Sequence, residues 1–512
     1  MTSINSSIRI NLIRRLNVEI ILDMYSTYFF SLLIIVSRCV IIWSYYYIIE
    51  ESYYKRFISL VILFVISIVC LIFFRNIFII LIGWDGLGVT SFLLVIYYKN
   101  RKSLGSGMIT ALTNRLGDCF FLVLIPLIFI EPHSLIQSKF ILVFILMILL
   151  RMTKSAQIPF SSWLPAAIAA PTPVRALVHS STLVTAGVYI LIRFNLNVMG
   201  PILIIGSITI IIAGLCACSE IDIKKVVALS TLSQLGVMIV SIGLNEKIYC
   251  FFHLLSHAIF KALLFICVGS MIHSLYGSQE SRSYNNRMLG IIFPRIFLNI
   301  ANLALIGFPF IAGFYRKDII LEIYFSNRKS YFIIIIFLVG VGLTAAYSVK
   351  LILFSIFSRR SNEPSIKSWG ERGKFEKIPL SVLGTLSIVG GFMLSKILEP
   401  ASPVIISPDK IIPLCIITLG VTLGWYITNK RNHILSSIWN LTPFFQSLAD
   451  FSKKGVKVTK ITDQGFVEIV GPNGLNRILI TYSIPLLSML FHITYVILLI
   501  SLCWSFRSFR IK

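Results

Sequence analysis

The sequence predicts an all-α polytopic membrane protein with about fourteen transmembrane helices. Of its 512 residues, 57% are hydrophobic and only 13% are charged. The apolar residues come in runs whose length approaches the roughly 20 residues that a membrane-spanning helix needs. A soluble core could not absorb this much apolar sequence, so we expect a lipid bilayer around most of the chain.

The expected spans follow one another along the whole chain. They run approximately over 26–49, 57–74, 77–98, 108–130, 140–158, 174–195, 200–219, 224–244, 248–273, 289–308, 332–357, 378–398, 411–428 and 478–505. The stretch 311–325 is too short to span alone, so we interpret it as the second half of a broken helix that starts at 289. Basic residues flank both ends of most spans, which leaves the orientation open.

Ahead of the first span, apolar residues at Ile8, Ile10 and Leu12 alternate with polar ones, which predicts a short strand or hairpin. The predicted organisation has four parts. They are 1–56 with the hairpin and first span, 57–199 and 200–360 as two inverted repeats, and 361–512 with the C-terminal spans.

Two helix breaks are predicted at membrane depth. The stretch after Lys154 contains four prolines, among them Pro159 and Pro165, which one regular helix cannot accommodate. The second break contains Pro309 and lies just ahead of Lys317. Freed backbone groups are tolerated inside a membrane only where they face protein or a wet cavity. Matching breaks in two halves of a chain are typical of inverted-repeat transporters and indicate the transport site.

The segment 429–477 differs from the rest of the chain. Its apolar residues recur at helical spacing with polar residues between them, and it becomes basic towards its end. This pattern predicts a lateral amphipathic helix that lies along the membrane or along neighbouring helices. An ordinary loop outside the membrane is the alternative.

Ionisable residues inside the apolar runs are the candidate functional groups, because each costs about 2.5–3.5 kcal/mol to insert. They are Asp85, Arg115, Asp118, Lys154, His179, His253, His257, Lys261, Lys317 and Asp318. Three of them, His253, His257 and Lys261, are spaced four residues apart and therefore form one polar stripe on a single helix. Histidine titrates near neutral pH, so the stripe favours proton transfer.

Each group also has a structural interpretation. Arg115 and Asp118 could form an ion pair that only supports packing. A single buried histidine such as His179 is often a satisfied core residue. We expect Arg75 and Lys350, near span ends, to extend towards the interface without a functional role.

The charge balance favours anionic lipids over nucleic acid as partners. The chain has 46 Lys and Arg against 21 Asp and Glu, a formal net charge of +25. The basic residues lie mostly between apolar runs, where they meet anionic headgroups such as those of cardiolipin.

Cofactor and metal sites are not expected in this chain. The nine cysteines form no CxxC pair, and the sequence has no Walker loop, no metal-spaced His/Glu pair and no GxGxxG that opens a helix after a strand.

Seven motifs carry a family resemblance. In order between positions 84 and 318 they are WDGLGVTSFLL, NRLGD, KSAQIPFSSWLP, APTPVRALVHSSTLVTAGVYILIRF, DIKKVVALSTLSQLG, HLLSHAIFKALLF and GFYRKD. They resemble the antiporter-like subunits of respiratory complex I, the mitochondrial NADH–ubiquinone oxidoreductase. FKALLF and GFYRKD are more similar to the chain 5 branch of that family than to chain 4 or chain 2.

The resemblance implies a proton-translocating subunit of the mitochondrial inner membrane. NADH, FMN, iron–sulfur clusters and ubiquinone would be used by other subunits, and the partners would be other membrane-arm subunits, especially chain 4. The implied proton path begins at a charge pair of Asp85 and Lys154, with Asp118 beside it. It continues over His179, His253, His257 and Lys261 and ends at Lys317 and Asp318.

The sequence departs from the family pattern at three positions, of which Asp85 belongs to the implied path. Asp85 stands where the family usually has a glutamate, so its reach towards Lys154 is shorter by one methylene. Ala169 replaces a frequent acidic residue, and Arg175 replaces a small one. From the resemblance we also expect about two helices of longer relatives, ahead of the first span, to be missing here.

Two other functions fit the same residues. One is an Mrp-type cation/proton antiporter, which shares these motifs. The other is a purely structural membrane subunit whose buried charges only hold the packing.

Overall fold

A computed structural model gives the structure of most of the chain. It describes residues 6–13, 16–48, 51, 53–129, 138–193, 200–274, 277, 279–280, 292–309, 311–326, 331–356, 373–398, 407–427, 477, 480–481 and 485. The chain divides into two compact units, Met1–Trp439 and Asn440–Lys512.

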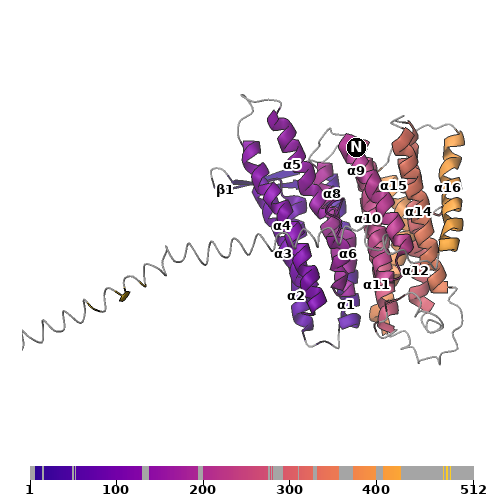
Figure 1. Ribbon diagram of the computed structural model, residues 1–512, viewed down its shortest axis with the longest axis horizontal. Coiled ribbons are helices and arrows are strands. Elements are labelled where there is room, and N and C mark those ends of the chain that lie inside the picture. The colour runs from indigo at the N-terminus through magenta and orange to yellow at the C-terminus, as the bar shows by residue number, and fades with distance from the viewer. Residues whose placement is uncertain are drawn as a thin grey trace, which may run out of the picture. The chain divides into compact units, whose positions relative to one another are not determined.

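The first unit is a bundle of helices that run side by side (Figure 1). Its elements are β1 (Ser6–Ile13), β2 (Leu16–Leu22), α1 (Met24–Ile48), α2 (Tyr54–Phe73), α3 (Ile77–Val95), α4 (Arg101–Phe129), α5 (Ser138–Lys154), α6 (Trp163–Ala166), η1 (Ala167–Ala169), α7 (Thr172–Val174), η2 (Arg175–Thr182), α8 (Leu183–Arg193), α9 (Gly200–Ser219), α10 (Ile223–Gly243), α11 (Lys247–Ser274), α12 (Ile292–Ile306), α13 (Ala312–Ser326), α14 (Tyr331–Ile356), α15 (Gly373–Leu398) and α16 (Ser407–Ile427).

The helical membrane fold is confirmed, but the count of about fourteen spans is not. Among the described residues, ten helices are long and apolar enough to cross a membrane, with Thr172–Arg193 as one of them. Ile292–Ile306 and Ile412–Tyr426 are shorter apolar helices. The difference arises partly because the span expected over 289–308 ends at the second break. The inverted relation of 57–199 to 200–360 stays a prediction.

The predicted N-terminal hairpin is present. Strands β1 and β2 pair antiparallel, with Ile8 opposite Ile20. The backbone N–H of Arg75 donates to the Glu19 carbonyl at 3.1 Å, which ties the hairpin to the turn between α2 and α3. The Arg75 side chain is 68% exposed and forms an ion pair with Glu19 at 3.6 Å, so its expected position near the interface fits the structure.

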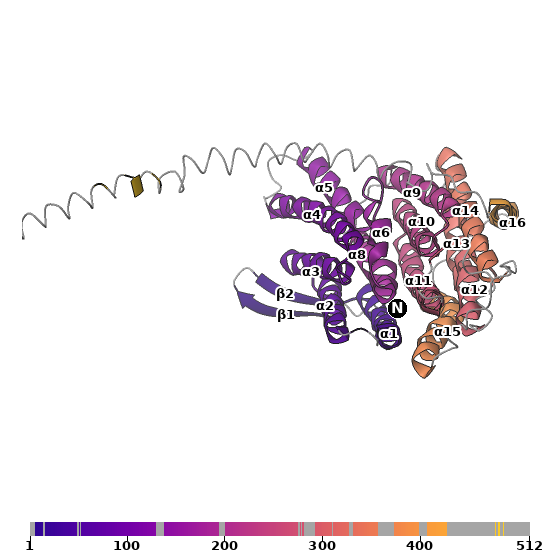
Figure 2. The same cartoon turned by 60° about the horizontal axis from the view of Figure 1, so that its bottom comes forward.

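Helix α11 lies in the middle of the bundle (Figure 2). It packs against α10, α12, α15 and η2, and nearly all of its side chains are buried. Because every face of α11 meets another helix, a polar group on any face is removed from lipid. The stripe predicted from the sequence therefore lies in the protein interior whichever way it points.

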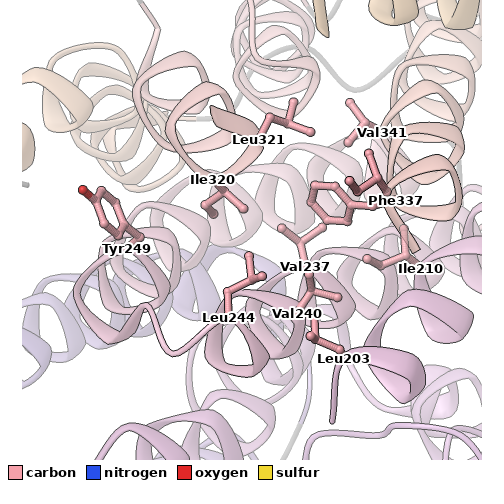
Figure 3. Close-up of a cluster of buried hydrophobic side chains, with 11 residues drawn as sticks. Leu203, Ile210, Val237, Val240, Leu244, Tyr249, Ile320, Leu321, Phe337 and Val341 are labelled. Atoms are coloured by element: carbon pink, nitrogen blue, oxygen red, sulfur yellow. The ribbon is translucent and has the colours of Figure 1, made fainter. Parts of the chain in front are cut away.

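An apolar cluster joins α9 and α10 to α13 and α14 (Figure 3). Val237 and Val240 of α10 meet Ile320 of α13 and Phe337 of α14 there. Dispersion contacts of this kind hold helices together inside a bilayer, where the lipid itself is apolar. The cluster fixes the position of α13, the helix that carries Lys317.

The first predicted break follows α5. Residues 155–162 form no regular helix, and short helical pieces then lead into η2, whose hydrogen bonds follow the wider π pattern. Pro159 lies in the irregular stretch. Pro165, expected to break a helix, instead lies inside α6, because a proline in the first turn has no hydrogen-bond partner to lose.

The second predicted break separates α12 from α13. Gly307 adopts a left-handed backbone with φ of 93°, and Pro309 follows in the turn. Gly313 allows α13 to pack directly on the end of α12, since a Cβ there would lie 1.7 Å from the Ala304 carbonyl oxygen. The break therefore depends on two glycines, one for its conformation and one for its close approach.

Much of the C-terminal part lies outside the described residues. The lateral helix expected over 429–477 is described only at Arg477, and the last expected span only at Ile480, Thr481 and Pro485, which are helical. The lateral helix stays a prediction.

The second break makes Gly313→Ala strongly destabilising. The added methyl group would overlap backbone, which cannot rotate away, so we expect a loss of about 1–3 kcal/mol or more. Gly105→Ala is the matched control, because nothing lies within 4 Å of its Cβ position and alanine favours a helix by up to about 1 kcal/mol. Thermal unfolding of the purified protein in detergent measures both, and equal melting of Gly313→Ala and the unmodified protein would contradict this packing.

Candidate functional site

Two carboxylates and one guanidinium form a cluster on α3 and α4. Arg115 Nη1 lies 3.4 Å from Asp118 Oδ2 and 3.7 Å from Asp85 Oδ1. Asp118 is buried, whereas the Asp85 side chain is 40% exposed. Arg115 therefore bridges an inner and an outer carboxylate.

Lys154, the last residue of α5, lies next to this cluster and is completely buried. Its Nζ donates to the Trp84 carbonyl and sits 3.9 Å from the centre of the Trp84 ring. A cation over a desolvated tryptophan gains about 2 kcal/mol. The indole and its carbonyl thus replace part of the water that the ammonium has lost.

The expected charge pair of Asp85 with Lys154 differs in the structure. Among the ion pairs of the described residues, Asp85 and Asp118 are both joined to Arg115. Lys154 interacts electrostatically with Asp118 first and with Asp85 second. The reason is geometric: the Lys154 ammonium lies against the Trp84 carbonyl and ring, while the short Asp85 side chain pairs with Arg115.

His179 lies in the π-helical segment η2, one turn after Arg175. It is buried, and its ring centre is 6.0 Å from that of Trp163. Neither ring nitrogen has a hydrogen-bonding partner among the described residues. Trp163 Nε1 in turn donates to the Thr153 carbonyl at 2.9 Å, so His179 and Lys154 lie on either side of one packed tryptophan.

The three residues of the α11 stripe are fully buried, as their spacing predicted. The rings of His253 and His257 stack with centres 6.3 Å apart. Lys261 Nζ donates to Ser230 Oγ of α10 at 2.5 Å. The stripe therefore continues from α11 into the polar face of α10.

A chain of hydroxyl groups leads on from Ser230. Ser233 Oγ donates to the Ser230 carbonyl at 3.0 Å and shares a 2.9 Å hydrogen bond with the Tyr347 hydroxyl of α14. Gln234 Nε2 lies 3.4 Å from the same hydroxyl. Tyr347 stands one turn from Thr344 on α14, so the two side chains share a face.

Lys317 of α13 is held by the broken end of α12. Its Nζ donates to the Leu305 carbonyl at 2.5 Å, to the Ile306 carbonyl at 3.3 Å and to Thr344 Oγ1 at 3.0 Å. The last carbonyls of a helix lack intrahelical partners and carry its negative dipole end, so they suit a cation. Asp318 belongs to α13, but its side chain lies outside the described residues.

Lys350 was expected to extend towards the interface, and this prediction is wrong. The side chain is only 3% exposed, and its Nζ donates to the carbonyls of Cys218 and Glu220, both at 2.6 Å. These carbonyls belong to the end of α9, so Lys350 caps that helix from α14.

Arg175, a replacement without an explanation in the sequence, has a structural role. Its Nε donates to the Ala170 carbonyl at 3.0 Å, and Nη2 donates to the same atom.

Arg151 of α5 was not singled out from the sequence, yet it is fully buried with Nη2 3.5 Å from Met147 Sδ. Among the described residues, no group of three His, Cys, Asp or Glu could hold a metal ion.

Family comparisons decide where this arrangement belongs. A family model described as NADH:quinone oxidoreductase/Mrp antiporter matches residues 75–344, and one described as NADH dehydrogenase subunit 5 C-terminus matches 347–511. NADH-ubiquinone oxidoreductase chain 5 of Lumbricus terrestris is 40% identical over 493 residues, which cover 90% of this chain and 85% of the relative. This chain belongs to the NADH–ubiquinone oxidoreductase chain 5 family.

Other comparisons agree with this membership. The chain 5 protein of Locusta migratoria is 43% identical over 425 residues, 80% of this chain and 74% of that one. The Mrp complex from Dietzia sp. has a TM-score of 0.73 at 21% identity, with 90% of this chain and 55% of that chain covered. The membrane-bound sulfane sulfur reductase, an archaeal respiratory membrane complex, has a TM-score of 0.68 at 19% identity, covering 83% and 88%. These two structures share the chain 5 fold.

The polar groups that the sequence did not indicate are hydroxyls inside apolar helices. Ser230 and Ser233 lie three residues apart in LSTLSQLG, and Thr344 and Tyr347 lie three apart in LTAAYSV. This spacing places each pair on one helix face, which was the available signal. Uncharged hydroxyl groups cost little free energy to insert into a membrane, however, so nothing in an apolar run marks them as functional.

The contacts of Lys350 predict that it stabilises the fold. Lys350→Met removes a charged donor from two carbonyls, and hydrogen bonds to charged groups contribute about 1.5–3 kcal/mol. We expect the purified protein to unfold at a lower temperature, whereas Lys374→Met, at an exposed position of α15, leaves it unchanged. Equal stability of the two variants would show that Lys350 does not cap α9.

Proposed function

We propose that protons cross the membrane along the buried polar residues described above. The path begins at the carboxylate cluster and Lys154, passes His179 and the α11 stripe, and ends at Lys317. The observation that carries the proposal is that three buried lysines, Lys154, Lys261 and Lys317, each donate to an oxygen that has no charge. Each ammonium therefore places exchangeable protons in the interior, next to an acceptor within hydrogen-bonding distance.

Family membership gives the path its setting. As a chain 5 protein, this chain is a membrane subunit of NADH:ubiquinone oxidoreductase, a proton-translocating enzyme complex of the mitochondrial inner membrane. We expect NADH, FMN, the iron–sulfur clusters and ubiquinone to be bound by other subunits. We also expect chain 4 to be its neighbour and anionic lipids such as cardiolipin to surround its basic ends.

The link from Lys261 to Lys317 is the best-supported part of the path. Ser230 Oγ accepts from Lys261, and Ser233 Oγ shares a hydrogen bond with the Tyr347 hydroxyl of α14. Ser233 bonds the backbone carbonyl of Ser230 and not its hydroxyl, so a water molecule must join the two serine hydroxyls. Thr344 on that face accepts from Lys317. Hydroxyl groups donate and accept at once, so they suit a proton relay together with intervening water.

The cluster at the other end is suited to coupling. Two unit charges about 4 Å apart interact by ~4 kcal/mol at an effective dielectric constant near 20. A membrane potential of about 150–200 mV opposes each proton by ~3.5–4.5 kcal/mol. A change in the separation of Asp118 and Lys154 would therefore change their interaction energy by about as much as one proton needs to cross against the membrane potential. The irregular stretch after α5 gives Lys154 the freedom to make that movement.

If the hydroxyl groups relay protons, substitutions along the link between α10 and α14 should reduce proton pumping by different amounts. Lys261→Met should abolish proton pumping through this chain, because a thioether carries no exchangeable proton. Tyr347→Phe should reduce it about three- to tenfold, because it removes one hydroxyl and leaves the packing in place. Tyr45→Phe, at an exposed position of α1, is the control.

Pumping by the assembled, reconstituted complex is measured as protons moved per NADH oxidised. Unchanged stoichiometry in assembled Lys261→Met complex would favour the purely structural alternative. Sodium-dependent exchange in place of NADH-driven pumping would favour the Mrp-type alternative.

The geometry of the first cluster predicts that its two carboxylates are unequal. Asp118→Asn should impair pumping at least tenfold, because Asp118 is buried and is the stronger electrostatic partner of Lys154. Asp85→Asn should have the smaller effect, since its side chain is 40% exposed and contributes less to the buried surroundings of Lys154. The same pumping assay compares them. A larger loss in Asp85→Asn would restore Asp85 as the direct partner of Lys154.

A further inference from the structure

A cavity of about 650 Å³ lies at one end of the bundle. Its lining includes Tyr47 near the end of α1, Lys102 in the first turn of α4 and Lys224 in the first turn of α10. Ile272, close to the end of α11, also lines it. Helix ends from four parts of the chain meet there, so the cavity lies at the level where a membrane surface would be.

The side chains that line this cavity are strongly cationic. Among its described residues, Lys102, Arg175, Lys224 and Lys225 line it, against the single carboxylate of Asp222. Asp222 is already engaged, because its Oδ2 lies 3.2 Å from Lys225 Nζ. Among the lining residues that the structure describes, cations therefore outnumber carboxylates by four to one.

Two of these cations also repel each other across the cavity wall. Arg175 and Lys224 are both buried and both line the cavity, so the two like charges share one enclosed space. Burying like charges side by side is costly unless an anion lies between them. The arrangement therefore calls for a bound negative group.

Arg175 is oriented to supply donors to such a group. Its side chain is only 3% exposed, and the Ala170 carbonyl occupies Nε and Nη2. Nη1 has no hydrogen-bonding partner among the described residues, and neither has Oγ1 of the neighbouring Thr172, which is equally buried. A guanidinium N–H, a hydroxyl and lysine ammonium groups are the donors that bind phosphate oxygens.

We infer that this cavity binds a phosphate-bearing anion, held by Arg175, Thr172 and Lys224. The site borders the proposed proton path at η2, and two of the positions at which this chain departs from the family pattern, Ala169 and Arg175, line it. Its position among the helix ends suits the phosphate of an anionic lipid headgroup. Free phosphate offers the same oxygens, so the experiment must distinguish the two sources.

The test uses the whole complex in nanodiscs of phosphatidylcholine. Each sample contains a small fraction of a photoreactive lipid, either phosphatidylglycerol or phosphatidylcholine, with the reactive group near the phosphate. Mass spectrometry then measures labelling of the peptides that contain residues 165–175 and 222–225. A parallel series adds millimolar inorganic phosphate before illumination.

We expect the phosphatidylglycerol probe to label these peptides at least fivefold more than the phosphatidylcholine probe. Lys224→Gln should lower that labelling about tenfold, through loss of one charge-assisted hydrogen bond. Arg101→Gln is the matched control, because Arg101 is exposed next to Lys102 but does not line the cavity. Arg175→Gln should lower the labelling by a similar factor. If loss of the Ala170 contact prevents the Arg175→Gln complex from assembling, the labelling of the Lys224→Gln complex alone decides the outcome.

The phosphate series identifies the source. Labelling that persists in millimolar phosphate assigns the site to a lipid headgroup, and labelling that phosphate displaces assigns it to the free ion. Equal labelling by the two probes, or full labelling of the Lys224→Gln complex, would overturn the inference. A carboxylate of a neighbouring subunit that fills the cavity would give the same negative result.

Discussion

Burying a lysine inside a membrane protein requires oxygen atoms that are not already used by a helix, and this requirement shapes the whole bundle. A regular helix satisfies its own carbonyls, so free ones occur where it ends or breaks. Lys317 takes the last carbonyls of α12 together with Thr344, and Lys350 takes those of α9. Arg175 follows the same rule at the end of η1. Helix ends and breaks therefore accommodate these three cations, whereas Lys154 takes the Trp84 carbonyl inside α3.

The breaks in turn depend on a few local conformations. Gly307 supplies the left-handed turn after α12, and Gly313 lets α13 approach closely enough for Lys317 to reach back. The central α11 needs no break, because Ser230 of α10 supplies an oxygen to Lys261 from the side. Neutral oxygens at each of these positions allow a lysine to exist in either protonation state.

The sequence predicted the fold class, both breaks and the α11 stripe, because these follow from chain-local patterns: apolar length, proline and glycine positions, and a spacing of four residues. It did not predict contacts between distant helices. The partner of Lys154 proved to be the Trp84 carbonyl and ring rather than Asp85, since backbone acceptors leave no mark on a sequence. The prediction for Lys350 was wrong because the sequence shows that Lys350 lies near the end of a span but not that the end of α9 lies beside it. Tyr347 was missed because an uncharged hydroxyl is common in an apolar run and does not indicate a functional site.

The central claim is that Lys261 and Lys317 communicate through the hydroxyl groups of α10 and α14. A structure of the assembled complex at a resolution that shows ordered water tests it most directly. We expect water molecules that complete an unbroken series of hydrogen bonds from Lys261 through Ser233 and Tyr347 to Thr344 and Lys317. A dry, apolar gap between Tyr347 and Thr344 would contradict it.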